Sequence, residues 1–244
     1  MFQGMCYGPQ MTHDPFRYFK TSREVIQLAV MMYVRFPLSL RNVEDLLHER
    51  GISVCHESIR FWVDRFGPVF AKQIRSKRSI YLRQHTQWKW HLDEVFVKIN
   101  GVQHYLWRAV DHEGEVLECY VTKKRDKLAA LRFLKKAMKR FGSPLMVVTD
   151  KLRSYGAAMR EIGSQERQNT EQYANNRAEN SHRPFRRLER AMTRFRQTST
   201  LQKFTSIHAS IYNHFNHQRH LEGRSRFKAM RDASLAEWRE LIVP

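Results

Sequence analysis

Three carboxylates in the sequence could together bind divalent cations. Asp93 lies in a β-rich segment among apolar neighbours, Asp150 follows the short apolar run Leu145–Val148, and Glu179 lies in an arginine-rich stretch. Carboxylate oxygens are hard ligands that suit Mg²⁺ or Mn²⁺ better than Zn²⁺. Two such ions, roughly 3.5–4 Å apart, can activate an attacking oxygen and stabilise a leaving one in phosphodiester chemistry. Acids near strand ends also occur without a ligand, so the pattern alone leaves both interpretations open.

The segments around these acids predict a mixed sheet flanked by helices. Trp90–Ile99 and Val102–Val110 are β-rich, and Asn100-Gly101 between them is a strong hairpin signal. Leu145–Val148 is typical of a buried parallel strand, so Asp150 should follow its carboxyl end, where ligand sites of α/β sheets gather. The remaining expected elements are a strand over 115–121, helices over 128–141 and 153–161, an ambiguous stretch over 163–172 that could hold a short edge strand, and helices over 174–198 and 201–215. This order indicates an α/β core.

Upstream of the sheet, three short helices are expected to form a helix-turn-helix. Apolar residues recur at helical spacing from residue 22, over 39–50 and from about 57, and Gly51 breaks the chain before the third helix. The third helix would direct Glu57, Ser58, Arg60, Phe61 and Arg65 outward, where a recognition helix presents side chains to base edges. Of these, the expected DNA contacts are Ser58, Arg60, Phe61 and Arg65. Small three-helix units also serve as protein-interaction modules. The expected division is a loose leader over 1–20, the helix-turn-helix domain over 21–75, a basic linker or connecting helix over 76–89, the α/β core over 90–200 and a helical extension over 201–244.

The charge balance points to a polyanionic partner. The chain of 244 residues has 43 Lys+Arg against 24 Asp+Glu, a formal charge of +19 and a pI near 10.2. The excess is concentrated over 72–90 and over 177–196, which indicates contacts with nucleic-acid phosphates rather than an evenly solvated surface. In the second cluster the expected DNA contacts are Arg183, Arg186, Arg187 and Arg190. With 42% hydrophobic residues the chain is not a disordered basic tail, and no membrane span, secretory signal or zinc-type cysteine pair is evident.

Five segments resemble the DDE transposases of the IS-six family of bacterial insertion sequences. They follow one another in the family's order and extend the resemblance over nearly the whole chain: FPLSLRNVEDLLHERGI (36–52), HLDEVFVKING (91–101), YLWRAVD (105–111), VVTDKLRSYGAA (147–158) and NNRAENSHRPFRR (175–187). The resemblance implies an RNase H-like catalytic core behind the helix-turn-helix. It also implies that Asp93, Asp150 and Glu179 are the catalytic, metal-binding triad and that Arg186, two helical turns after Glu179, holds a phosphate near the metals.

The same resemblance sets the expected activity. A transposase of this kind binds the terminal inverted repeats of its element and uses two Mg²⁺ ions, with Mn²⁺ as a possible substitute. It cleaves and transfers DNA strands in replicative transposition, assembles from at least two protomers, and works in the bacterial cytoplasm at the nucleoid. The interval between Asp150 and Glu179 is shorter than in better-known members, and the missing residues fall in the ambiguous stretch over 163–172. Two alternatives stay open: a non-catalytic helix-turn-helix protein or inactive remnant, and a general nuclease of RNase H type.

Several other polar residues are expected to have secondary roles. Glu94 should point to the opposite face of the strand from Asp93 and is interpreted as structural. Asp111 should cap a turn. His182, three residues after Glu179, could orient a phosphate or water, whereas His214, His217 and His220 are interpreted as basic surface or DNA contacts.

Overall fold

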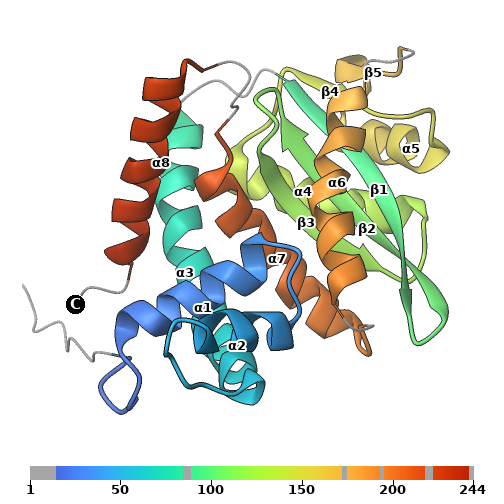
Figure 1. Cartoon of the computed structure of the whole chain (residues 1–244). Helices are drawn as coiled ribbons and strands as arrows, with labels where there is room; N and C mark the ends of the chain where they lie inside the picture. The colour runs from blue at the N-terminus through green and yellow to red at the C-terminus, as the bar shows by residue number, and fades with distance from the viewer. Residues whose placement is uncertain (1–14, 85–88, 172–174, 193–194, 218–221, 242–244) are drawn as a thin grey trace, which may run out of the picture.

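In the computed structural model, a helical N-terminal unit precedes a five-stranded mixed sheet that helices cover on both faces (Figure 1). The structure describes residues 15–84, 89–171, 175–192, 195–217 and 222–241. The predicted fold class, an α/β core behind an all-α domain, is confirmed. In the described part of the chain, no helix combines the length and apolar character that crossing a bilayer requires.

Three helices form the N-terminal unit: α1 (Arg23–Arg35), α2 (Leu40–His48) and α3 (His56–Gln84). α1 ends just before Pro37, and Ser39 and Asn42 form a capping box at the start of α2. Gly51 has a φ of +75°, the left-handed conformation that lets the chain turn toward α3. The first 14 residues of the predicted loose leader lie outside the described residues. Phe16, which the leader was expected to leave loose, is instead buried and stacks on Phe66 of α3 with ring centroids 4.5 Å apart.

The structure replaces the predicted linker with a continuation of α3. The helix passes through the expected boundary at residue 75 and reaches Gln84, which is the connecting-helix alternative, and residues 85–88 lie outside the described part. Pro68 is inside this helix. The N-terminal unit therefore extends toward the core as one continuous helix up to Gln84.

The sheet has the strand order β3-β2-β1-β4-β5, with β1 (Lys89–Ile99) at its centre. β2 (Val102–Asp111) pairs antiparallel with β1 through the predicted hairpin, where Asn100 and Gly101 have φ angles of 49° and 79°. β3 (Val116–Thr122) pairs antiparallel with β2. On the other side of β1, β4 (Met146–Val148) and β5 (Gln168–Asn169) run parallel to it. The ambiguous stretch therefore does contain a short edge strand, although the interval between Asp150 and Glu179 is short.

Helices on the two faces of the sheet divide the core into two apolar layers. On one face, α4 (Lys127–Phe141) and α5 (Arg153–Ile162) pack against Leu92, Trp107 and Ala109. On the other, α6 (Asn176–Ala191) and α7 (Thr198–Phe215) pack against Val95, Val97 and Leu106. Alternate residues of β1 therefore face different helix pairs, which decides where its polar residues point.

The predicted boundary at residue 200 falls within α7, a helix that serves both parts of the molecule. Leu201, Phe204 and Ala209 of α7 pack in the sheet layer, whereas Ile207, Ile211 and Phe215 pack in the core of the N-terminal helices. A Cβ on Gly67 of α3 would lie 3.2 Å from Ile207 Cδ1, so glycine allows the two helices to approach closely. The predicted helix over 174–198 is two elements, because α6 ends at Ala191 and Gln197 is extended.

The interpretation of His214 as a basic surface or DNA contact is wrong, because its side chain is buried; His217 is half-buried, and His220 lies outside the described residues. His214 Nε2 donates to the carbonyl oxygen of Ser234 in α8 (Arg224–Arg239) at 2.8 Å, and His217 Nε2 forms a hydrogen bond of 2.9 Å with the Ser234 hydroxyl. The two side chains thus attach α8, which lies beside α3 in Figure 1, to the end of α7.

Asp111 caps the turn after β2, as expected, and it should make stability depend on pH. Its buried Oδ1 accepts hydrogen bonds from the backbone N–H groups of Glu113 and Glu115, both at 2.9 Å. Burial raises its pKa from 3.8 to about 6. The folded protein therefore binds this proton more tightly than the unfolded chain, and the free energy of unfolding falls as pH rises between about 4 and 6.

The Asp111→Asn variant should lose this component of the pH dependence. Relative to the wild type, its free energy of unfolding should increase by about 2–3 kcal/mol between pH 4 and pH 7. Urea unfolding of both proteins at several pH values measures the difference, and a difference that stays constant with pH would refute the role given to Asp111.

Candidate active site

The strand register brings Asp93 and Asp150 to the same level of the sheet. β4 pairs with β1 over only three residues, and the last pair is Val148 with His91. Each aspartate comes two residues after that pair on parallel strands, at the point where the edge of β1 is no longer covered. The Leu152 N–H donates to Asp150 Oδ1 at 3.1 Å and helps to fix the carboxylate. One oxygen each from Asp93, Glu94 and Asp150 lies within 4.8 Å of the others.

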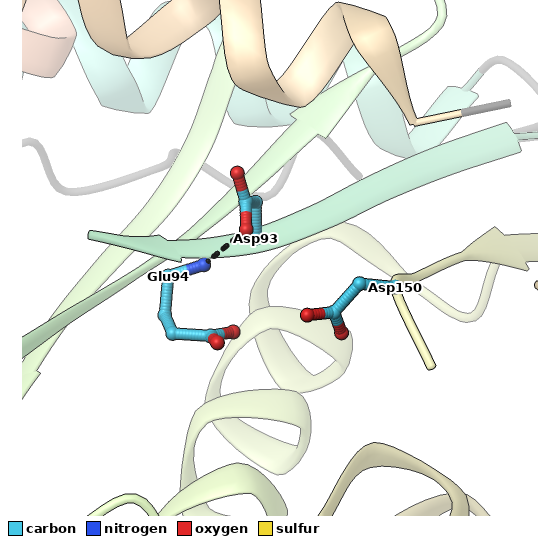
Figure 2. Close-up of side chains that lie close together, drawn as sticks. All are labelled: Asp93, Glu94 and Asp150. Atoms are coloured by element: carbon cyan, nitrogen blue, oxygen red, sulfur yellow. Dashed lines mark hydrogen bonds between the residues drawn. The ribbon is translucent and has the colours of Figure 1, made fainter. Parts of the chain in front are cut away.

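Asp93 and Glu94 point to opposite sides of β1, as the strand alternation predicts (Figure 2). The Glu94 backbone N–H donates to Asp93 Oδ1 at 2.8 Å. The Glu94 side chain extends toward Asp150 on the side of α4, and it is 2% exposed. Because the edge of β1 is open here, side chains from both faces reach Asp150, so Glu94 belongs to the same carboxylate group despite its opposite direction.

A guanidinium from another element neutralises part of this group. Arg125 immediately precedes Asp126, the N-cap residue of α4, and its Nη2 pairs with Glu94 and lies 3.5 Å from Asp150 Oδ2. Burial raises the pKa of Asp150, and the nearby Asp93 raises it further, whereas the Leu152 N–H and Arg125 oppose the shift. The charge of Arg125 thus favours the ionised form of a half-buried carboxyl group.

Helix α6 is fastened to β1 beside the carboxylates by three polar contacts. Before its first turn, Asn175 Nδ2 donates to the Leu92 carbonyl oxygen at 2.8 Å. His182 Nε2 lies 2.8 Å from Asp93 Oδ2, and Arg186 Nη2 donates to the Phe96 carbonyl oxygen at 2.7 Å. The three positions are separated by seven and four residues, so they form one stripe along the helix that faces the uncovered part of β1.

Glu179 lies on the same stripe but outside the group of three carboxylates. It is in the first turn of α6, between Asn175 and His182, and it is exposed. Within the described ranges, its carboxylate has no hydrogen-bond or ion-pair partner. The structure therefore brings two of the three predicted catalytic acids together and places the third on a helix docked beside them.

His182 contacts Asp93 rather than solvent. Burial lowers the pKa of His182, while the hydrogen bond to Asp93 opposes the shift. A neutral imidazole can still donate its Nε2–H to Asp93 Oδ2. In place of the expected contact with a phosphate or water, His182 binds Asp93, and we expect it to orient that carboxylate.

If the chain has the DNA strand joining activity that the resemblance implies, the His182→Ala variant should retain it at a rate reduced by about 10- to 100-fold, because the aspartate would lose the contact that orients it. His182→Asn, which keeps a donor, should lose less. Single-turnover joining rates compare the two variants with Glu179→Ala. A near-total loss equal to that of Glu179→Ala would instead place His182 in direct contact with the reacting groups.

A second arginine supplies a buried positive charge on the face of Asp93. Arg108 of β2 is directly opposite Asp93 in the strand register, and the residue is 1% exposed. Its Nε and Nη2 have no hydrogen-bond partner in the described part of the chain. Burial lowers the pKa of Arg108, and the Asp93 carboxylate acts in the opposite direction. This charge contributes to the potential that Asp93 experiences.

The predicted DNA contacts occupy two separate surfaces. Arg60, Phe61 and Arg65 of α3 are exposed and Ser58 is half-buried. On α6, Arg183, Arg187 and Arg190 are exposed, whereas Arg186 is half-buried and pairs with Glu189 as well as with the Phe96 carbonyl. Arg186 would have to give up these contacts to hold a phosphate.

Sequence reasoning missed Arg125 and Arg108. For Arg108 a signal exists, since a charged residue in the apolar strand YLWRAVD needs an explanation. Arg125 stands in the basic run KKR before a helix, where a solvent-exposed charge is the ordinary expectation.

The donor set fits a divalent cation that prefers oxygen ligands. All three grouped side chains are carboxylates, and Glu94 Oε2 is buried without a hydrogen-bond partner in the described structure. A buried carboxylate oxygen in that state is costly unless a cation or donor completes its environment. The site therefore has the chemistry of a Mg²⁺ or Mn²⁺ site.

Comparison with known proteins finds a matching domain family, similar transposases and similar solved structures. A family model described as the DDE domain matches residues 87–218, a range that contains Asp93, Asp150 and Glu179. A transposase for the insertion sequence-like element IS431mec of Staphylococcus aureus strain Mu50 is 35% identical over 175 residues, which cover 69% of this chain and 75% of that protein. The transposase of element IS257 in transposon Tn4003 of S. aureus is 34% identical over the same lengths. Among solved structures, the catalytic core domain of the HTLV-2 integrase in complex with magnesium has a TM-score of 0.43 and 16% identity, covering 58% of this chain and 96% of that one.

Proposed function

Because the chain belongs to the DDE-domain transposases of the IS-six family, we propose that it binds the terminal inverted repeats of its element and catalyses metal-dependent DNA cleavage and strand transfer. The observation that supports this most is the placement of Asp93 and Asp150 at one uncovered edge of β1, with α6 and Glu179 docked beside them. The long basic surface of α6 and the outward side chains of α3 supply the positive charge that DNA phosphates require.

Asp93, Asp150 and Glu179 would hold the divalent cations, two Mg²⁺ ions with Mn²⁺ as a substitute. When bound, such ions increase the reactivity of the attacking oxygen and stabilise the charge on the leaving oxygen. Asp93 is oriented by His182 and by the Glu94 N–H, and Asp150 by the Leu152 N–H. Asn175 anchors the start of α6 beside β1, which keeps the carboxylate of Glu179, four residues later, near the other two carboxylates.

The reaction consists of two phosphoryl transfers on DNA. Water attacks the phosphodiester at the element's end and the P–O3′ bond breaks, so that the element's end keeps a 3′-hydroxyl and the flanking strand keeps a 5′-phosphate. That hydroxyl then attacks a target phosphodiester in line, forming a new bond and releasing a target 3′-hydroxyl. The exposed arginines of α6 would hold the phosphates near the carboxylates, and positioning of this kind supplies much of the acceleration.

The finer biological assignments follow the family. Replicative transposition requires two element ends in one complex, so at least two protomers should assemble on DNA. The two transposases named above come from a bacterium, and a protein acting on chromosomal DNA would work at the nucleoid.

The helix-turn-helix should read the repeat through α3, and alanine variants of Arg60 and Arg65 show whether each side chain contacts a phosphate or a base. Arg65 lies with its Cζ 5.7 Å from the Phe19 ring, and Arg60 pairs with Glu57 at 3.4 Å. If a side chain contacts a phosphate, its alanine variant should weaken binding to all DNA sequences and reduce the salt dependence. If it contacts a base, the variant should lose about 1–3 kcal/mol of preference at one position. Binding titrations against single-base variants of the repeat, at several salt concentrations, separate the two. No effect from either variant would exclude α3 as the reading helix.

The position of the cut tests the proposed activity. DNA carrying the element's end, incubated with the full chain and Mg²⁺, should be nicked at the boundary of the repeat. Cuts spread over unrelated DNA would indicate a general nuclease, and repeat binding without any cut would indicate a non-catalytic DNA-binding protein.

A further inference from the structure

The carboxylate group contains a positive charge of its own. The same nitrogen of Arg125, Nη2, contacts Glu94 Oε1 and lies 3.5 Å from Asp150 Oδ2, so it is situated between two members of the group. Carboxylate oxygens on either side of a space of this kind are also the ligands that a divalent cation would use. We propose that Arg125 acts as a positioning residue that neutralises Glu94 and Asp150 in the metal-free protein and gives up Asp150 when the metal binds. The inference rests on the proposed function and deepens it, because it makes Arg125 a determinant of metal affinity.

The two contacts of Arg125 differ in a way that suits this exchange. The Glu94 side chain is 2% exposed and the Asp150 side chain 41% exposed, so a charge on Glu94 depends far more on a partner than one on Asp150. The distance to Asp150 is at the limit of a hydrogen bond. Metal binding can therefore remove the contact with Asp150 while the contact with Glu94 persists.

The surroundings hold the guanidinium close to this position after such a change. Arg125 is attached directly to the capped start of α4, where Asp126 accepts the Ala129 N–H at 2.9 Å. Its Cζ lies 5.8 Å from the centre of the Phe96 ring, a favourable position for a cation. A small shift along Phe96 is enough to leave Asp150 free.

The charges predict effects of opposite sign for the two partners. Removing the Arg125 charge removes repulsion toward a divalent cation and releases Asp150, so Mn²⁺ should bind about tenfold more tightly to Arg125→Gln. Removing the Glu94 charge frees Arg125 to pair with Asp150 alone, so Glu94→Gln should bind about tenfold more weakly. In the double variant the two effects should largely cancel, to within about threefold of wild type. If the pair only stabilised the fold, both single variants would weaken binding.

Mn²⁺ titration of the full chain without DNA, monitored by the electron paramagnetic resonance signal of free Mn²⁺, tests the inference. Arg125→Lys, which keeps the charge, should stay within about threefold of wild type. Lys127→Gln serves as the matched control, since Lys127 pairs with Glu161 rather than with the carboxylate group. Thermal unfolding of each variant checks that it is folded.

Asp150→Asn separates the possible failures. If wild type binds Mn²⁺ through Asp150 but Arg125→Gln binds with equal or lower affinity, the role of Arg125 is overturned and the proposed function stands. If wild type and Asp150→Asn bind Mn²⁺ equally, the carboxylates are not the metal site and the proposed function fails with the inference.

Discussion

Replacing Asp150 with asparagine is expected to reduce DNA strand joining by at least about 1,000-fold while leaving binding to the element's ends unchanged. The substitution preserves the shape of the side chain and the acceptor for the Leu152 N–H, but it removes the negative charge at the uncovered edge of β1. Asp93→Asn should have the same effect, because the two carboxylates lie close together and would, in the proposed site, act on the same reacting phosphate. Groups that act as a unit in catalysis each abolish most of the rate when removed singly.

Single-turnover joining and end-binding titrations on the same protein preparations measure both properties. Asp232→Asn is the matched control, since Asp232 is an exposed aspartate of α8 and should join ends at the wild-type rate. An Asp93 or Asp150 variant that joins ends at the wild-type rate would exclude that residue from the site. Loss of end binding together with joining would show that the substitution had damaged more than the chemistry.

Glu179→Gln is expected to cause an equally large loss of joining without changing stability. The side chain is exposed and its carboxylate makes no polar contact in the described structure, so its free energy of unfolding should stay within about 0.5 kcal/mol of wild type. Its importance comes from its position on the stripe of α6 that is fastened to β1 at Leu92, Asp93 and Phe96. Few exposed surface residues combine no effect on folding with a complete effect on activity.

Joining rates and urea unfolding of Glu179→Gln, compared with Glu189→Gln nearly three turns further along α6, test this expectation. Glu189 pairs with Arg186 and should affect joining much less. Wild-type joining by Glu179→Gln would mean that the carboxylates grouped with Asp93 are sufficient, and Glu94 would then be the candidate for the third catalytic acid.

The elements that carry the site could be predicted from the sequence because their signals are local. The two-residue turn of the hairpin requires positive φ angles, which Asn100 and Gly101 adopt readily, and the run Leu145–Val148 is apolar throughout. The hairpin and β4 were therefore both expected. Asp150 at the end of β4 followed directly. By contrast, the division into domains depended on composition, and α3 and α7 cross the expected boundaries because each packs on more than one partner.

The contacts between distant residues could not be predicted in the same way. Strand alternation correctly put Asp93 and Glu94 on opposite faces, yet it gives no information on where a neighbouring strand ends. Because β4 stops at Val148, the edge of β1 is open and Glu94 reaches Asp150. The position of Arg125 depends on how α4 begins above this edge, which only the tertiary structure shows. His214 and His217 illustrate the same limit, since their partner is a residue of α8.

The most direct test of the central claim is Mg²⁺-dependent joining of the element's terminal repeat to plasmid DNA, with wild type and Glu179→Gln measured side by side. The proposed site predicts joined products from the wild type in Mg²⁺, none when the metal is chelated, and none from Glu179→Gln under either condition. Joined products that form without a divalent cation, or equally from both proteins, would contradict it.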